Sequence, residues 1–284
     1  SSDLVIDVYG GGRNGAVGRL NTDTAAVIVV YDGVLNKNVY GGGEKGFSNG
    51  NTFVIVNDGE IKGNIFGGAR MAEIDGDTHV NINGGTINND VYGGNDVSGL
   101  ISGSTNLNIL SSVEGSVYGG GNGSYAYSDK VQGDYWYNKG LSSIDSLNKI
   151  RPNIKTSNIL IAGTQSKTTY IGGSVYCGGN SASVLSTGTA PTLTLGSYVT
   201  ASGIFLGNNG ENMVQADTLA RYADGDYSTL TLTEQAQFDK YMLAVDMPFQ
   251  PNLVYATGYQ DYTTRIGSFY YGGNVGSLDR KSVV

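Results

Sequence analysis

The stretch NINGGTINNDVYGGND, residues 81–96, places a Val-Tyr pair directly before two glycines. The same signature returns as VYGGGR, VYGGGE, IFGGAR, VYGGGN and VYCGGN, and then in the weaker copies IFLGNN and YYGGNV. The signatures start at residues 8, 39, 65, 91, 117, 175, 204 and 270, so the intervals are 31, 26, 26, 26, 58, 29 and 66. Three consecutive intervals of 26 indicate an internal repeat.

Each repeat has the pattern of short strands. Apolar residues lie 11, 9 and 4 positions before the signature, as Val80, Ile82 and Ile87 do before Val91. This spacing produces period-two alternation, which is typical of half-buried strands. NDG and NGG turns separate the strands, because Gly and Asn adopt positive φ there at little cost. A unit of this size buries its apolar face only by stacking on copies of itself. We therefore expect one all-β domain over 1–284, a right-handed parallel β-helix (β-solenoid) with turns of about 26 residues.

An aromatic residue follows each signature Val or Ile and should point to the opposite side of the strand. Stacked turns would bring these side chains together in an aromatic ladder. We favour a structural role that fixes the register of the turns, because functional sites rarely recur in every repeat. The other role left open is a surface for flat ligands such as sugar rings. The predicted ladder consists of Tyr9, Tyr40, Phe66, Tyr92, Tyr118, Tyr176, Phe205 and Tyr271.

A second column of residues follows the glycines and alternates in charge along the axis: Arg13, Glu44, Arg70 and Asp96, with Asn122 and Asn180 after them. Opposite charges on adjacent turns fix the register, whereas like charges would repel. Glu44 and Asp96 should lie two turns apart, roughly 10 Å, which is near the carboxylate separation of inverting glycosidases. Arg70 between them would keep both carboxylates ionised, although general acid catalysis needs one of them protonated. We therefore expect register control rather than catalysis.

Two segments interrupt the repeat. Residues 123–157 predict an aromatic-rich loop insertion, which fits either a recognition loop or rings packed over the solenoid flank. Residues 210–252 predict a small insertion of two helices, although TLTLT at 229–233 could instead form a strand. The ligand-contact candidates are the aromatic residues of the first insertion: Tyr125, Tyr127, Tyr135, Trp136 and Tyr137.

The composition narrows the function further. A net charge of −8 and a pI near 4.6 argue against nucleic acid or an anionic membrane as partner, and no apolar run is long enough to insert into a membrane. The single histidine, His79, alternates with Val80 and Ile82 and should face solvent. Cys177 replaces a signature glycine and should be a small buried residue. Because zinc, calcium and nucleotide motifs are absent from the sequence, we predict no metal and no cofactor.

The unit T-x-V-x-I-x-G-G-x-I-x-x-[ND]-V-Y-G-G-G, seen at Thr78–Asn95 and Thr52–Ala69, resembles repeats of large proteins of gut bacteria. Those repeats belong to adhesin-like or pectate-lyase-like right-handed β-helices that are secreted or anchored at the surface. The resemblance covers the chain outside its two insertions. It implies an extracellular or bacterial cell-surface location and a role in adhesion or in contact with a glycan or a surface protein.

We expect a non-enzymatic module. The alternatives are a polysaccharide lyase or glycoside hydrolase on the same scaffold, and a purely structural stalk. Pectate-lyase-like enzymes carry aspartates for calcium and a basic residue on one sheet, and no such cluster occurs in register in this sequence. Neither end has an obvious cap over its strand edges, so we also expect the chain to be part of a longer repeat array or multidomain protein.

Overall fold

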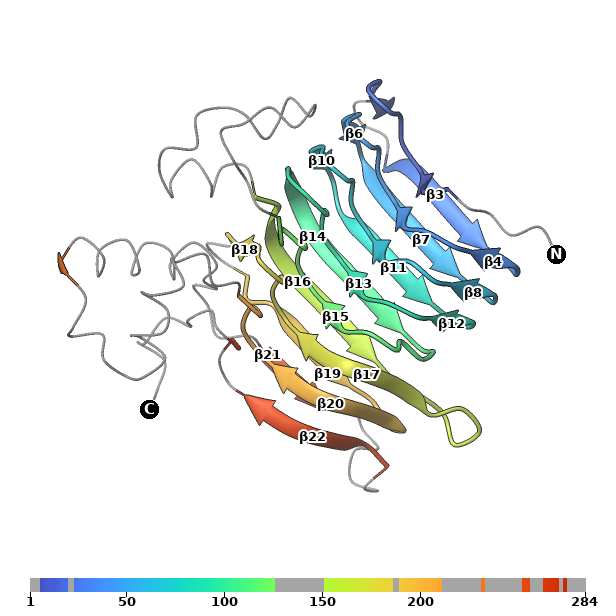
Figure 1. The fold of residues 1–284 in the computed structure, drawn as a ribbon, viewed down its shortest axis with the longest axis vertical. Coiled ribbons are helices and arrows are strands. Elements are labelled where there is room, and N and C mark those ends of the chain that lie inside the picture. Colours follow the sequence, from blue (N-terminus) through green and yellow to red (C-terminus); the bar gives the residue numbers. More distant parts are fainter. Residues whose placement is uncertain are drawn as a thin grey trace.

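The computed structural model describes residues 6–19, 23–125, 151–185, 189–210, 231–232, 252–255, 263–270 and 273–274. Within these residues the regular secondary structure is almost entirely β-strand, and every pairing between two strands is parallel. The turns stack one after another from the N-terminal end, blue in Figure 1, to β22, which is red. The predicted all-β parallel solenoid is confirmed. No helix within the described ranges is long and apolar enough to cross a membrane.

Three parallel sheets run along the solenoid. The signature sheet contains the Val-Tyr pairs in eight strands: β1 (Val8–Tyr9), β5 (Val39–Tyr40), β9 (Ile65–Phe66), β13 (Val91–Tyr92), β15 (Val117–Tyr118), β17 (Thr169–Tyr176), β20 (Val199–Phe205) and β22 (Arg265–Tyr270). The narrow sheet has three strands: β4 (Val34–Leu35), β8 (Glu60–Ile61) and β12 (Thr86–Ile87).

The broad sheet has eleven strands and carries the longest ones. Four are short: β2 (Val17–Gly18), β6 (Ser48–Asn49), β10 (Ile74–Asp75) and β18 (Ser183–Val184). The others are β3 (Thr24–Val30), β7 (Asn51–Val56), β11 (Thr78–Ile82), β14 (Leu100–Ile109), β16 (Asn153–Ile161), β19 (Thr192–Leu195) and β21 (Asn252–Tyr255).

Equivalent residues of successive repeats lie opposite one another. Val91 pairs with Ile65 on one side and with Val117 on the other. Val117 pairs in turn with Val175, so the 58-residue interval is a single turn with an insertion. The insertion is shorter than predicted, because β16 begins at Asn153 and the predicted loop was extended to residue 157. Residues 126–150 of this insertion, and 211–230 and 233–251 of the predicted helical insertion, lie outside the described residues.

The core is a set of aliphatic columns inside the coil. The positions predicted 11, 9 and 4 residues before the signature are fully buried, as Val54, Val56 and Ile61 show with 0% exposure. Burial of each such side chain stabilises the fold by about 1.5–3 kcal/mol. Cys177 is also fully buried in this core, as predicted, and burial raises the pKa of its thiol to about 12.

A column of hydroxyls joins the broad sheet to the signature sheet. Thr78 at the start of β11 is fully buried, and its Oγ1 donates to Gly93 O at 2.6 Å. The backbone ladder leaves this carbonyl unused, since Gly67 N donates to Tyr92 O and Gly68 N donates to Gly94 O. A buried carbonyl needs a donor, so the threonine supplies it. The same bond recurs as Thr52 to Gly67 O, Thr105 to Gly119 O and Ser157 to Cys177 O.

The glycines have two different roles. Gly59 and Gly85, in the NDG and NGG turns, have φ of +98° and +73°, the left-handed region that favours glycine. The corner glycines of the signature instead permit close approach between turns. A Cβ added to Gly93 would lie 2.4 Å from Gly119 O of the next turn. Among the described residues, side chains larger than glycine occur at this corner position only where they enter the core, as Cys177 and Leu206 do.

Candidate ligand-contact site

The aromatic ladder forms as predicted over most of its length, but its rings are buried. Neighbouring ring centroids are 4.5–4.9 Å apart and the rings are within 12° of parallel. The exposed fractions of Tyr40, Phe66, Tyr92, Tyr118 and Tyr176 are between 1% and 7%. Each ring face is covered by the next ring, so a flat ligand has no access to the middle of the ladder. The rings form a second core alongside the aliphatic one.

The last residue of the predicted ladder is wrong by one position. Tyr270 stacks on Phe205, with ring centroids 4.5 Å apart, and Phe269 occupies the inward position opposite Ile204. In the final copy Tyr271 replaces the first signature glycine, so counting back from the two remaining glycines selects Tyr271. Packing of Phe269 against the core decides the register instead. Tyr271 itself lies outside the described residues.

The charge column stacks as predicted along the glycine corner. Arg13 Nε lies 3.2 Å from Glu44 Oε2, and Arg70 Nη1 lies 4.0 Å from Glu44 Oε1. Glu44 is thus held between two guanidinium groups. This pairing of opposite charges on adjacent turns supports the expected role in register.

Asp96 continues this column but is almost completely buried, with 2% of its surface exposed. Its carboxylate accepts hydrogen bonds from Tyr40 Oη at 3.0 Å, Asn122 Nδ2 at 2.9 Å and Tyr125 Oη at 2.8 Å. Burial raises the pKa of Asp96, while these hydrogen bonds and the charge of Arg70 act in the opposite direction. All of these contacts are within the protein, so Asp96 is a structural acceptor.

An asparagine ladder extends the column beyond Asp96. Asn180 Nδ2 donates to Asn122 Oδ1 at 3.0 Å, Asn209 Nδ2 to Asn180 Oδ1 at 2.6 Å, and Asn274 Nδ2 to Asn209 Oδ1 at 2.9 Å. The last two residues were missed in the sequence. The signal was present, because each lies five positions after the inward residue of its repeat. The amide groups all point in the same direction, and Asp96 accepts from the first of them.

Of the five ligand-contact candidates in the loop insertion, only Tyr125 is among the described residues. Its hydroxyl is bound to Asp96, and its backbone N donates to Gly123 O at 2.9 Å. Tyr125 therefore attaches the start of the insertion to the solenoid corner. Tyr127, Tyr135, Trp136 and Tyr137 lie outside the described residues.

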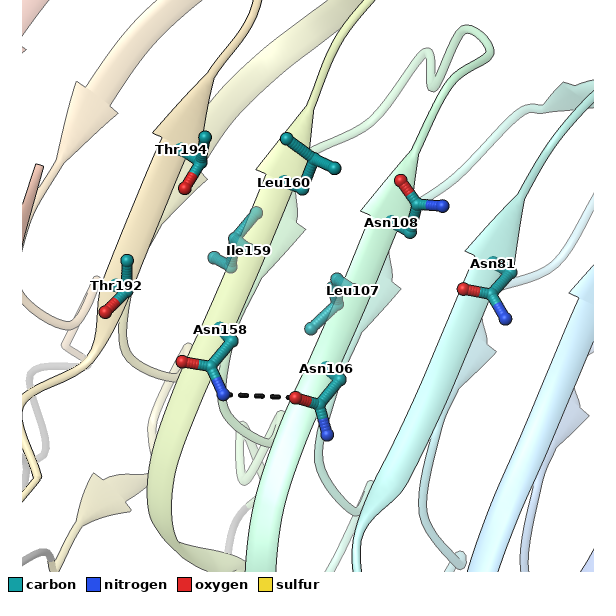
Figure 2. A pocket seen from close by; sticks show the side chains of 9 residues that line it. All are labelled: Asn81, Asn106, Leu107, Asn108, Asn158, Ile159, Leu160, Thr192 and Thr194. Carbon is teal, nitrogen blue, oxygen red and sulfur yellow. Dashed lines mark hydrogen bonds between the residues drawn. The ribbon is translucent and has the colours of Figure 1, made fainter. Parts of the chain in front are cut away.

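A shallow depression of about 180 Å³ lies on the outer face of the broad sheet, across β11, β14, β16 and β19 (Figure 2). The pattern of the sequence does not predict it. Amide and hydroxyl side chains from alternating strand positions stand around it, together with an exposed leucine. The lining residues are Asn81, Asn106, Leu107, Asn108, Asn158, Ile159, Leu160, Thr192 and Thr194.

Two columns of outward-facing residues cross this depression. In one, Asn106 pairs with Asn158, whose Nδ2 donates to Asn106 Oδ1 at 3.0 Å, as the dashed line in Figure 2 shows. In the other, Asn108 lies opposite Leu160, which has no donor to give. Asn108 Oδ1 is shielded from solvent and, in the described part of the chain, has no hydrogen-bond partner. The depression thus contains an amide oxygen whose hydrogen-bonding capacity is unused.

His79 stands beside this region, on the outward side of β11. The prediction that it faces solvent is only partly correct, because its ring stacks on Phe53 with centroids 4.4 Å apart and is half-buried. This burial lowers the pKa of His79. The stacked ring is thus held in its neutral form over a wider pH range.

Within the described ranges, no group of three or more His, Cys, Asp or Glu side chains is placed to hold a metal ion. Comparison with family models, with curated proteins and with solved structures finds no match to this chain. The functional interpretation therefore depends on the geometry of the solenoid faces.

Proposed function

We propose that this chain is a non-enzymatic β-solenoid module of an extracellular or bacterial surface protein, and that it contacts a glycan along the outer face of the broad sheet. The observation that carries the proposal is the depression with the unsatisfied Asn108 Oδ1. A buried acceptor without a partner costs about 1–3 kcal/mol. A ligand hydroxyl would recover this free energy by donating to the oxygen once the amide of Asn108 turns towards the depression.

The chemistry of the lining suits a sugar. Each asparagine amide offers both donors and acceptors, which match the neighbouring hydroxyls of a sugar ring. Leu160, 37% exposed, and the methyl groups of Thr192 and Thr194 supply apolar contact for the ring carbons. The outward-facing side chains of the broad sheet repeat from turn to turn at the strand spacing of ~4.8 Å. A polymer of similar units could therefore make similar contacts on successive turns. The absence of any charged residue in the lining favours a neutral glycan.

The arrangement of the acidic residues supports a binding role over the lyase or hydrolase alternative. The lining of the depression contains only Asn, Thr, Leu and Ile side chains, none of which can act as a general acid. Glu44 is paired with two arginines, and Asp96 is enclosed by three donors. Neither carboxylate belongs to the lining.

A binding screen against neutral polysaccharides tests this proposal. We expect Asn158→Ala to weaken binding about tenfold, the equivalent of 1.4 kcal/mol, because it removes one polar contact and disorders Asn106. The matched control is Asn83→Ala, since Asn83 Nδ2 donates to Asn57 Oδ1 at 3.0 Å in an equally exposed pair on a different part of the solenoid. This control should bind within about twofold of the wild type.

Each other outcome has a definite meaning. Binding to no neutral glycan contradicts the proposed function. Equal losses in both variants contradict the proposed site. A third variant, Trp136→Ala, tests the loop insertion, and a loss of binding in this variant alone moves the site there. Release of reducing ends from any bound glycan shows that the protein is an enzyme.

A further inference from the structure

The turn between β7 and β8 brings a backbone nitrogen into contact with the side chain of the residue before it (Figure 1). Asp58 is exposed, and Gly59 follows it with a φ of +98°. Gly59 N donates to Asp58 Oδ1 at 2.8 Å, so the carboxyl carbon Cγ is one bond away from an atom that touches this nitrogen. Glycine has no Cβ to shield the nitrogen. Groups that are held in contact in this way react much faster than groups that must first meet.

The backbone ladder does not use the hydrogen of this nitrogen. On either side of it, Asn57 N donates to Val30 O and Glu60 N donates to Gly33 O, both at 2.8 Å. Within the described chain no backbone carbonyl accepts from Gly59 N. The nitrogen can therefore move towards Cγ of Asp58 without breaking a hydrogen bond between turns.

Other glycine nitrogens of the solenoid are held away from such a reaction. Gly50 and Gly123 each follow an asparagine, whose side chain is open to the same attack. However, Gly50 N donates to Asp75 O at 2.9 Å, and Gly123 N donates to Asp96 O at 2.8 Å. Attack by either nitrogen would break a bond between adjacent turns. The turn at Asp58 lacks this protection.

We propose that Asp58 is a modification site, at which the chain converts to isoaspartate. Gly59 N bonds to Cγ of the protonated carboxyl, the Cγ–OH bond breaks, and the hydroxyl leaves with the amide proton as water. The product is a cyclic succinimide. Water then adds to the former backbone carbonyl of Asp58 and the bond from this carbon to Gly59 N breaks, so the chain continues through Cβ and Cγ. One water is lost and one is gained, and no oxidant or reductant takes part.

The modification lengthens the backbone of the turn by one methylene group. Gly59 O accepts from Thr86 N at 2.9 Å, and the neighbouring Glu60 N donates to Gly33 O. These bonds hold β8 between β4 and β12 in the narrow sheet. The additional atom shifts Gly59 relative to both neighbouring turns, so the narrow sheet is weakened where the isoaspartate forms.

The matched comparison is Asp75 with Gly76, a second Asp-Gly sequence of equal exposure in the next turn. Asp75 lies in β10, and its Oδ1 accepts from Ser102 Oγ at 2.8 Å instead of from its own glycine. The folded wild type is incubated in mildly acidic buffer, where part of each carboxyl is protonated. Because isoaspartate has the same mass as aspartate, peptide mapping with electron-transfer fragmentation locates it. We expect isoaspartate to accumulate about tenfold faster at Asp58 than at Asp75.

The same incubation in concentrated urea separates the effect of the fold from that of the sequence. Without the turn, the two Asp-Gly sequences should react at similar rates. Equal rates in the folded protein would overturn the proposal. A difference that persists in urea would overturn it as well, because the sequence rather than the turn would then be the cause.

Asp58→Glu is the control variant, since it keeps the carboxylate and cannot close the five-membered ring. No rearranged product should form at this position, and its appearance would show that the signal was wrongly assigned to Asp58. Wild type that has been incubated until most molecules are modified should unfold at a lower urea concentration than fresh protein, whereas incubated Asp58→Glu should not change. An unchanged transition in the modified wild type would contradict the weakening of the narrow sheet.

Discussion

Replacement of Thr78 by valine tests whether the buried hydroxyl column holds each glycine corner to the broad sheet. Thr78 Oγ1 is the donor to Gly93 O, a buried carbonyl that the backbone ladder does not use. Valine keeps the shape of threonine and removes the donor. The change therefore isolates one hydrogen bond without opening a cavity.

The size of the effect follows from two opposing contributions. A buried carbonyl left without its partner destabilises the fold by about 1–3 kcal/mol. The additional buried methyl group of valine stabilises it by about 0.8 kcal/mol. We therefore expect the free energy of unfolding to fall by about 1 kcal/mol for Thr78→Val, and by about 3 kcal/mol when Thr52 and Thr105 are replaced as well.

Equilibrium urea denaturation followed by circular dichroism measures this loss. The slope of the transition should stay constant while its midpoint falls, because the surface exposed on unfolding is unchanged. Thr86→Val is the matched control, since Thr86 is exposed and the same chemical change there should stay within about 0.5 kcal/mol of the wild type. A triple variant as stable as the wild type would refute the role of the hydroxyl column.

Three further predictions concern the ladders and the titratable groups. Phe66→Ala removes a ring that is 1% exposed and stacked on both faces, so the free energy of unfolding in urea should fall by about 3–5 kcal/mol. Tyr270 is 49% exposed and stacked on one described ring, so Tyr270→Ala should lose less than half of that. Burial raises the pKa of Asp96 above its value in the unfolded chain. The free energy of unfolding of the wild type should therefore fall relative to that of Asp96→Asn as the pH rises from about 4 towards neutrality. A constant difference between the two proteins over that range would contradict this. Burial against Phe53 lowers the pKa of His79, so an NMR titration of this single histidine should have its midpoint below 6.5, and Phe53→Ala should move the midpoint upward.

The strands and their register were predictable because every repeat contains the same spacing of apolar residues. Val54, Val80 and Leu107 occupy one column in the sequence alignment of the repeats and one column in the solenoid. The prediction failed at Tyr271, because this residue replaces the first signature glycine and the two remaining glycines were a misleading reference point. In the folded chain the burial of Phe269 sets the register there.

The candidate site could not be predicted in the same way. Strand alternation shows that Asn108 faces outward, but the depression depends on which residue of the following turn lies beside it. That residue is Leu160, 52 positions away, because the chain inserts a long segment between the two strands. The burial of the aromatic ladder was also hidden, since part of its cover comes from Asp96, which lies 56 positions after Tyr40.

The asparagine ladder has a consequence for how this protein could have lengthened. Duplication of the turn that carries Asn180 would insert one more amide between two others, and every donor would still meet an acceptor. Duplication of the turn that carries Glu44 would instead place two carboxylates on adjacent turns, where they repel. Single turns can thus be added without electrostatic repulsion on the C-terminal side of Asp96, whereas on its N-terminal side only a pair of turns, one of each sign, preserves the alternation.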